Sequence, residues 1–150
     1  MLVYRIAGKK HSRDLSGTGA ALFGGRWNKK GTPVLYTGEN PEIALLETIV
    51  HTPPMLVPAT DILTLEIPDH SITALSIGDL PKNWTDYPAP TILSEIAEAW
   101  VLKSETLALQ VPSCIISSAS NYILNCRHPE FQLVKLVGLE DFRFDVRLRK

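Results

Sequence analysis

The chain has 150 residues, 45% of them hydrophobic and 21% charged, which is typical of one globular domain with a sizeable core. Its formal net charge of −1 argues against a general nucleic-acid-binding protein, and no apolar run reaches the roughly 18 residues that span a membrane. The N-terminus does not resemble a signal peptide, and the only cysteines are Cys114 and Cys126, so we expect a cytoplasmic protein with reduced thiols.

The first half of the chain is predicted to form three strands and a helix. Residues 2–6 and 33–37 are predicted strands, with 8–22 mostly a loop between them. A helix over about 41–51 follows, because Asn40 is a good N-cap and Pro41 suits the first helical position. Residues 61–67 alternate between apolar and polar side chains as a strand does.

The second half begins with a proline-dotted, irregular stretch over 68–90. Thr91 is the expected cap of a helix over about 92–103. The remaining expectations are strand-like segments at 107–111 and 114–116, a polar loop at 121–129, and late strands at 131–137 and 142–148. Because strands dominate and no linker or repeat is visible, we predict a single compact domain, 1–150, of the α+β class with mixed β-sheets and a few helices.

The segment 24–28, Gly-Gly-Arg-Trp-Asn, has the composition of a loop that binds an anionic, ring-containing molecule. Its glycines allow close approach of the backbone, and Arg26 offers a planar fork of donors to phosphate or carboxylate. Residues 1–31 carry seven Lys or Arg and one acid, so positive potential is concentrated around this loop. The alternative is a glycine turn with a surface arginine, a core Trp27 and a solvated basic face.

The predicted helix carries Glu47 on the same face as Ile43, Val50 and His51. Since the segment is apolar almost all round, Glu47 is expected on a buried or half-buried face, where an unpaired carboxylate is costly. Two interpretations stay open. Glu47 reaches water or pairs with a structural arginine, or it shares a cleft with Arg26 and Tyr36 as part of a functional site.

Other kinds of site find little support. No Gly-x-Ser-x-Gly elbow surrounds Ser113, so a serine nucleophile is not expected. The histidines and cysteines lack metal spacing, and both the Walker motif and the G-x-G-x-x-G fingerprint are absent. We therefore predict no metal site and no cofactor.

Taken together, the motifs resemble the RES domain family along nearly the whole chain. The matching segments are 4–5 (Tyr-Arg), 15–20 (Leu-Ser-Gly-Thr-Gly-Ala), 24–28, 31–36 (Gly-Thr-Pro-Val-Leu-Tyr), 44–47 (Ala-Leu-Leu-Glu), 111–113 (Val-Pro-Ser) and 121–125 (Asn-Tyr-Ile-Leu-Asn). The family is named for an arginine, a glutamate and a serine, which match Arg26, Glu47 and Ser113 here. The chain departs from the family pattern at Ala119, at Cys126 and at 98–99 (Glu-Ala).

The resemblance implies a fold similar to ADP-ribosyltransferases and a toxin of a type II toxin–antitoxin system that breaks down NAD⁺. NAD⁺ would be the substrate and not a cofactor. The implied partner is an antitoxin of the Xre, helix-turn-helix type that blocks the active site, with no direct nucleic-acid or membrane partner. Two further readings remain open: an ADP-ribosyltransferase that modifies a macromolecule, and a non-enzymatic binding module with a vestigial site.

Residue roles follow from the resemblance and from the chemistry of the nicotinamide–ribose bond, whose cleavage passes through an oxocarbenium-like state. The carboxylate of Glu47 would stabilise that state, and Arg26 would bind the pyrophosphate. Tyr36 and Trp27 would stack on nicotinamide or shape its pocket, while Ser113 and Asn121 would hydrogen-bond the ribose or the amide. The expected catalytic residues are Glu47, Arg26 and Tyr36, and the expected NAD⁺-binding residues are Arg26, Trp27, Asn28, Tyr36, Ser113 and Asn121.

Overall fold

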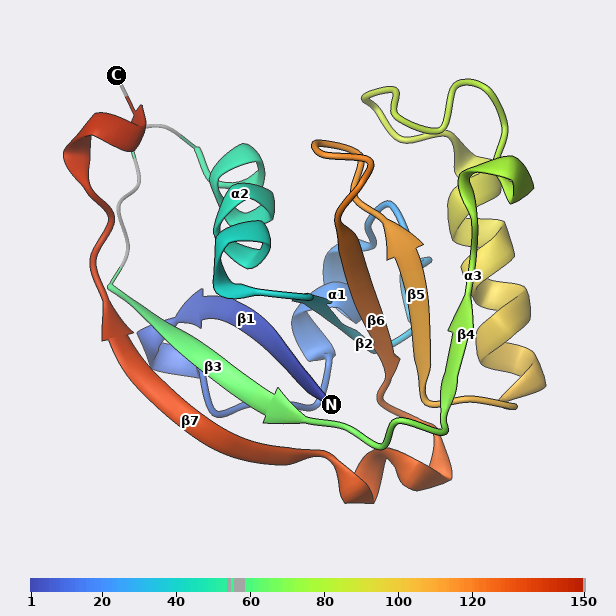
Figure 1. Ribbon diagram of the computed structural model, residues 1–150, viewed down its shortest axis with the longest axis horizontal. Helices are drawn as coiled ribbons and strands as arrows, with labels where there is room; N and C mark the ends of the chain where they lie inside the picture. Colours follow the sequence, from blue (N-terminus) through green and yellow to red (C-terminus); the bar gives the residue numbers. More distant parts are fainter. Residues whose placement is uncertain (54, 56–58, 150) are drawn as a thin grey trace.

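A seven-stranded mixed β-sheet organises the chain (Figure 1). The structure is a computed structural model that describes residues 1–53, 55 and 59–149. The strands are β1 (Leu2–Gly8), β2 (Val34–Gly38), β3 (Thr60–Glu66), β4 (Ile72–Ala74), β5 (Ala108–Pro112), β6 (Ser120–Asn125) and β7 (Lys135–Phe142). The α-helices are α1 (Thr18–Phe23), α2 (Pro41–His51) and α3 (Thr91–Lys103), and the 3-10 helices are η1 (Lys9–His11), η2 (Ile77–Asp79), η3 (Pro129–Leu133) and η4 (Val146–Arg149).

The sheet has the strand order β4-β5-β6-β2-β1-β3-β7 and consists of two well-paired parts that meet at a narrow seam. β1 pairs with β3 along its whole length, and β2 pairs with β6 from Val34 to Gly38. In contrast, β1 and β2 pair in register only at Tyr4 and Gly38. Helix α2 contacts β1, β2 and β6, and Figure 1 shows it standing between the two parts. α2 therefore bridges the seam.

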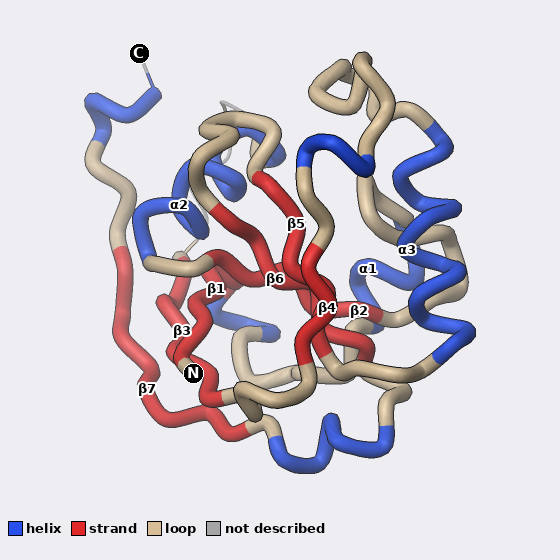
Figure 2. The backbone as a smooth tube through the Cα atoms, turned by 45° about the vertical axis from the view of Figure 1, so that its right-hand side comes forward, coloured by secondary structure: helices blue, strands red, loops and turns tan. Residues whose placement is uncertain are grey.

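Both faces of the sheet are buried in the part formed by β2, β5 and β6. Because side chains alternate along a strand, neighbouring residues enter different core clusters. One cluster, which includes Leu93, Ala97 and Trp100 of α3, also takes Val34, Leu109 and Ile123 from the strands. The other cluster takes Leu35, Ala108, Tyr122 and Leu124. Figure 2 shows α3 lying along this part of the sheet.

Helix α2 begins and ends as the sequence predicts. The side chain of Asn40 accepts a hydrogen bond from the backbone N–H of Ile43 at 2.8 Å, and Pro41 occupies the first turn. The helix ends at His51, so Glu47 lies near the middle of a rigid element whose start is fixed. None of the helices in the described part of the chain is long and apolar enough to cross a membrane.

The predicted fold class is confirmed: the chain forms an α+β domain with a mixed sheet and few helices. The strands expected at 2–6, 33–37 and 61–67 are present as β1, β2 and β3. The expected loop at 8–22 instead contains η1 and the start of α1, and β4 and η2 interrupt the irregular stretch 68–90. α3 has Pro90 at its N-cap position with no side-chain cap, so the capping role expected of Thr91 is wrong.

The polar loop expected at 121–129 is the clearest error. Residues Ser120–Asn125 form β6, which lies between β5 and β2 in the sheet. Three apolar side chains in its centre are buried, namely Tyr122, Ile123 and Leu124, whereas the polar residues that suggested a loop lie toward its ends. The segment 114–116 is not a strand, because the chain turns there between β5 and β6.

The two late strands expected at 131–137 and 142–148 are also wrong in their bounds. One strand, β7, runs through the predicted turn and is flanked by η3 and η4. The glycine that suggested the turn, Gly138, lies opposite Thr64 where the pairing register shifts. A Cβ at position 138 would lie 3.1 Å from Thr64 Oγ1, so this glycine serves close strand packing.

Candidate active site

A cleft of about 840 Å³ gathers residues from both parts of the sheet and from α1, α2 and the loop that follows α1. Its lining combines charged groups with apolar and aromatic ones, as ligand-binding clefts commonly do. The polar residues that matter for the argument below are Arg5, Arg26, Tyr36, Glu47, His51, Cys114 and Asn121. Ser113 lies directly behind this lining, between Pro112 and Cys114.

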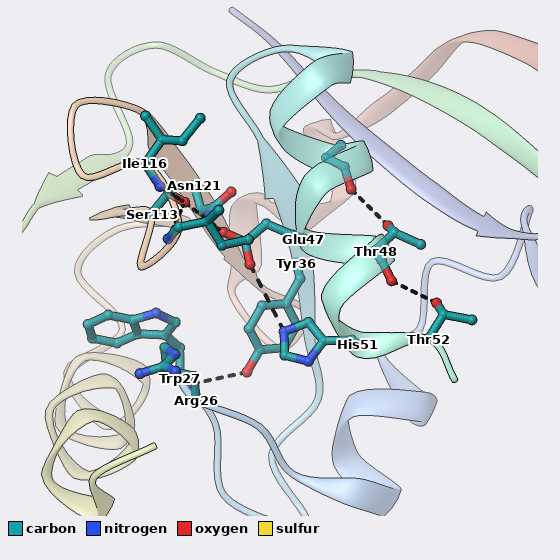
Figure 3. Close-up of polar contacts among 12 residues, drawn as sticks. Arg26, Trp27, Tyr36, Glu47, Thr48, His51, Thr52, Ser113, Ile116 and Asn121 are labelled. Atoms are coloured by element: carbon teal, nitrogen blue, oxygen red, sulfur yellow. Dashed lines mark hydrogen bonds and ion pairs between the residues drawn. The ribbon is translucent and has the colours of Figure 1, made fainter. Parts of the chain in front are cut away.

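Glu47 is held by two side chains that come from the other side of the cleft (Figure 3). Its Oε1 accepts a hydrogen bond from Ser113 Oγ at 2.9 Å and another from Asn121 Nδ2 at 2.7 Å. Its side chain is 22% exposed, so the carboxylate is half-buried and still reaches the cleft. Glu47 is therefore fixed by neutral donors, and the alternative that it pairs with a structural arginine is not seen among the described residues.

The hairpin of β5 and β6 explains why these donors converge on one oxygen. Ser113 follows β5 directly, and Asn121 pairs with Val111 across the hairpin. The hydroxyl of Ser113 also accepts hydrogen bonds from the backbone N–H groups of Ile115 and Ile116, at 3.1 and 3.3 Å. These two bonds fix the hydroxyl as a donor toward Glu47.

A second network surrounds Tyr36. Its hydroxyl donates to Asn28 Oδ1 at 2.6 Å and accepts from the backbone N–H of Trp27 at 3.1 Å. Asn28 is 2% exposed, and its Nδ2 donates to the backbone carbonyls of Ala20 and Thr32. Burial raises the pKa of Tyr36, so the phenol stays protonated. A Cβ at Gly25 would lie 2.6 Å from the Tyr36 hydroxyl, so this network needs glycine beside it.

Arg26 lines the cleft, but its guanidinium already has protein partners. One nitrogen donates to the backbone carbonyl of Trp84 at 2.7 Å and another to that of Asp86 at 3.0 Å. The adjacent Trp27 is 3% exposed and belongs to the core cluster with α3. The loop expected to bind a ligand is thus tied into the protein at Arg26, Trp27 and Asn28.

Arg5 is a candidate residue that the sequence interpretation missed. It lies in β1 and lines the cleft, and its buried Nε has no hydrogen-bond partner among the described residues. Burial lowers the pKa of Arg5, but an arginine remains charged in proteins. Asp14, in the same cleft lining, partly compensates the charge of Arg5, but the unsatisfied Nε remains costly, which favours an anionic ligand beside this guanidinium. The available signal was an arginine in the middle of an otherwise apolar strand.

The structure brings Glu47, Ser113 and Asn121 into one cluster and Tyr36, Asn28 and the backbone of Trp27 into another. Arg26 contacts neither cluster through a hydrogen bond. Cys114 lies near both Arg26 and Glu47, and burial raises the pKa of its thiol. The cleft therefore offers one fixed carboxylate, a neutral phenol and two arginines of different availability.

The sequence model of the RES domain matches residues 2–147. This chain belongs to the RES family. A protein named Toxin Res from Yersinia enterocolitica is 35% identical over 152 residues, covering 99% of this chain and 100% of that protein. A protein of the same name from Pseudomonas putida is 36% identical and covers 99% of each chain. A Sphingobium protein named Prs ADP-ribosylating toxin is 32% identical, covering 90% of this chain and 86% of its own length.

The fold of this RES domain has also been seen in a solved structure, that of the MbcT–MbcA toxin–antitoxin complex of M. tuberculosis. The two chains superpose with a TM-score of 0.78 at 20% sequence identity. The superposition covers 95% of this chain and 84% of the other. This likeness shows that the seven-stranded arrangement is a fold shared with that chain.

Proposed function

We propose that this RES domain is a toxin that acts in the cytoplasm by cleaving the nicotinamide–ribose bond of NAD⁺. The observation that carries the proposal is the fixed carboxylate of Glu47 in a cleft that is also lined by Arg5, whose buried Nε has no hydrogen-bond partner among the described residues. NAD⁺ cleavage needs a negative group near the oxocarbenium-like ribose and a positive group near the pyrophosphate, and this cleft holds a carboxylate and a cation. The names of three full-length relatives support the toxin role.

Glu47 acts on the ribose. As the bond to nicotinamide breaks, positive charge develops on the ribose ring, and a carboxylate already held in place stabilises it without reorganisation. Ser113 and Asn121 hold Oε1, so the second oxygen of Glu47 remains available toward the cleft. Nicotinamide leaves as a neutral molecule, so its departure needs no general acid.

Arg5 binds the pyrophosphate together with Arg26. Arg5 is the better placed of the two, because binding an anion would satisfy a buried donor that now has no partner. Arg26 has two of its five N–H donors engaged by the carbonyls of Trp84 and Asp86, and the others can still face the ligand.

Trp27, Asn28 and Tyr36 shape the pocket and support its wall. The amide of Asn28 is occupied by backbone carbonyls, and Trp27 is too deeply buried to offer an open ring face. Tyr36 lines the cleft with its ring, while its hydroxyl fixes the loop that carries Arg26. We therefore assign substrate contact to the ring of Tyr36 and a supporting role to Trp27 and Asn28.

The partner we propose is an antitoxin of the Xre, helix-turn-helix type that covers the cleft. A toxin that consumes an essential metabolite must be blocked in the cell that makes it. A partner that covers Glu47 and Arg5 prevents both stabilisation of the ribose and binding of the pyrophosphate. The solved structure with the same fold is that of a toxin–antitoxin complex, which supports an antitoxin as the partner.

The test is to incubate the purified domain with NAD⁺, follow nicotinamide release, and compare Glu47→Gln with Glu42→Gln. Gln at position 47 can still accept hydrogen bonds from Ser113 and Asn121, so the fold is kept while the negative charge is lost. We expect turnover to fall about 10²–10³-fold, by about 2.7–4 kcal/mol, with little change in KM. Glu42 is exposed in the first turn of the same helix, so its variant should keep wild-type turnover. Full turnover per folded molecule in Glu47→Gln would exclude this mechanism.

A second candidate is transfer of ADP-ribose to a macromolecule, which the name of the Sphingobium relative favours. Both activities release nicotinamide and use the same Glu47 chemistry. They differ in the fate of the ADP-ribose, so NAD⁺ labelled in its adenine and incubated with cell extract separates them. Label in free ADP-ribose supports hydrolysis, and label on protein or nucleic acid supports transfer.

A further inference from the structure

The two carboxylate oxygens of Glu47 have different surroundings (Figure 3). Oε1 accepts both hydrogen bonds, from Ser113 and Asn121. Oε2 faces Nε2 of His51, one turn later on α2, at 4.0 Å. This distance is too long for a direct hydrogen bond. An oxygen atom in the cleft can lie at about 2.8 Å from both atoms at this separation, and both residues line the cleft.

His51 presents its imidazole to solvent at this position. Its side chain is 61% exposed, and it lines the same cleft as Glu47. The hydroxyls on its own helix turn are already committed, because Thr48 donates to the carbonyl of Ala44 and Thr52 to that of Thr48. The hydroxyl of Tyr36 is engaged by Asn28 and Trp27. Cys114 also lies near Glu47, but burial raises the pKa of its thiol, which therefore keeps its proton. Among the other described groups near Oε2, His51 is the one that can accept a proton from a bound molecule.

We propose that His51 Nε2 and Glu47 Oε2 form the site that holds and activates the nucleophile, an inference that rests on the proposed NAD⁺ cleavage. The ligand is an oxygen nucleophile that carries a proton, of which water is always available. Its oxygen attacks C1′ of the ribose as the C1′–N bond breaks, and nicotinamide leaves with the bonding electron pair. The proton passes to His51 Nε2, and water as the nucleophile gives ADP-ribose.

This division of work follows from the charges. Glu47 must stay ionised to stabilise the ribose cation, so it is poorly suited to take the proton itself. A neutral imidazole beside it accepts the proton readily, and the resulting imidazolium then lies next to the carboxylate. The i,i+4 spacing on one helix keeps the two groups together without help from the rest of the chain.

The experiment measures NAD⁺ cleavage in buffer with a fixed fraction of methanol, where methanol competes with water as the nucleophile. We compare wild type with His51→Gln and His51→Ala, and record nicotinamide release and the ratio of methyl ADP-riboside to ADP-ribose. Both variants should lose on the order of 10²-fold in kcat, the lower range for a general base, with KM for NAD⁺ unchanged. The product ratio should change, and added imidazole should restore turnover to His51→Ala.

The matched control is His70→Gln. His70 is 68% exposed and pairs with Glu130 at 2.8 Å, so it is a similar histidine–glutamate pair that does not line the cleft. This variant should behave as wild type. A third arm adds inorganic phosphate: an ADP-ribosyl phosphate product that depends on His51 would assign the same site to hydrogen phosphate.

The inference is overturned if both His51 variants keep wild-type kcat and product ratio. It is also overturned if kcat falls while the product ratio stays constant and imidazole has no effect, since His51 would then only support the fold. If the wild-type protein releases no nicotinamide, the proposed function fails and this inference falls with it. Normal release from wild type and from both His51 variants removes this inference alone.

Discussion

Arg5 and Arg26 differ in how much of their hydrogen-bonding capacity the protein already uses. Arg26 was singled out from the sequence because it follows two glycines, a pattern typical of ligand-binding loops. Its guanidinium joins that loop to the carbonyls of Trp84 and Asp86. Arg5 belongs to a segment that matches the family, but its place inside a predicted strand does not by itself indicate a role in ligand binding. Its lack of a partner depends on contacts that only the folded chain reveals.

For Arg5→Met we expect weaker NAD⁺ binding and no loss of stability. Removing one hydrogen bond to a charged ligand group costs about 1.5–3 kcal/mol, which raises Kd about 10–150-fold. The folded protein loses a desolvated guanidinium with an unsatisfied Nε and its attraction to Asp14, two opposing effects, so Tm should stay close to that of wild type. Calorimetric titration with NAD⁺ and a thermal melt on the same preparation measure both quantities. Unchanged affinity would exclude the pyrophosphate contact.

For Arg26→Met we expect a larger loss of stability and a smaller loss of NAD⁺ affinity than for Arg5→Met. The variant leaves two backbone carbonyls without their donors, so the free energy of unfolding should fall by about 1–3 kcal/mol. NAD⁺ affinity should fall less than in Arg5→Met, because part of this guanidinium is not directed at the ligand. Urea unfolding and the same titration give the comparison. A stable protein with a larger affinity loss than Arg5→Met would make Arg26 the main phosphate ligand.

At the scale of elements, the loop after α1 depends on Gly25, whereas α1 itself tolerates a change at Gly19. Gly25→Ala would place a Cβ 2.6 Å from the Tyr36 hydroxyl and 3.0 Å from Asn28 Oδ1, so the network must shift. We expect a loss of about 1–3 kcal/mol in unfolding free energy. Gly19→Ala, inside α1, meets no atom within 4 Å and should gain about 0.5–1 kcal/mol. Urea unfolding of both variants checks this pair, and equal effects would contradict it.

Local signals predicted α2 correctly, because its cap, its first-turn proline and its end are all set by neighbours in sequence. They failed for β6 and β7. β6 is stabilised by pairing with β5 and β2, which come from other parts of the chain. Without that information, the polar residues at its ends led to the prediction of a loop. In β7, Gly138 signals a turn locally but serves close packing against Thr64.

In the candidate site, too, features set by neighbours in sequence were predictable and features set by distant contacts were not. Glu47 can be identified from the sequence because an acidic residue in an apolar helix is costly to bury unless it is paired or functional. The family resemblance pointed to Ser113 and Asn121 as substrate contacts, but their hydrogen bonds to Glu47 were not predicted, since 66 and 74 residues separate them from it in sequence. The buried state of Asn28 and Trp27 could not be read from the sequence, because it depends on contacts with Tyr36 and α3.

At the scale of the whole molecule, alkaline pH should destabilise the fold through Cys126 and Tyr36. Burial raises the pKa of Cys126 from 9.0 to about 12, and it raises the pKa of Tyr36 as well. Between about pH 9 and about 12 the unfolded chain loses the thiol proton that the folded chain keeps. The free energy of unfolding therefore falls as pH rises through this range, by at most about 1.4 kcal/mol per pH unit for each group.

Cys126→Ala tests the contribution of the thiol. The variant loses some packing beneath Gly17, an effect that is the same at every pH. Its unfolding free energy, measured in urea from pH 8 to 11, should therefore fall with a shallower slope than that of wild type. Identical slopes would show that Cys126 does not carry the effect.

The narrow seam between β1 and β2 also constrains the order in which the protein can be completed during synthesis. β1, which carries Arg5, is synthesised before the other strands of this sheet, but its main partner is β3, and β3 is in turn paired with β7. That part of the sheet is assembled from the beginning, the middle and the last fifth of the chain. The part of the sheet that holds Arg5 can therefore be completed only after β7 has been synthesised, so a nascent chain that has not yet reached β7 carries Arg5 on an incomplete sheet.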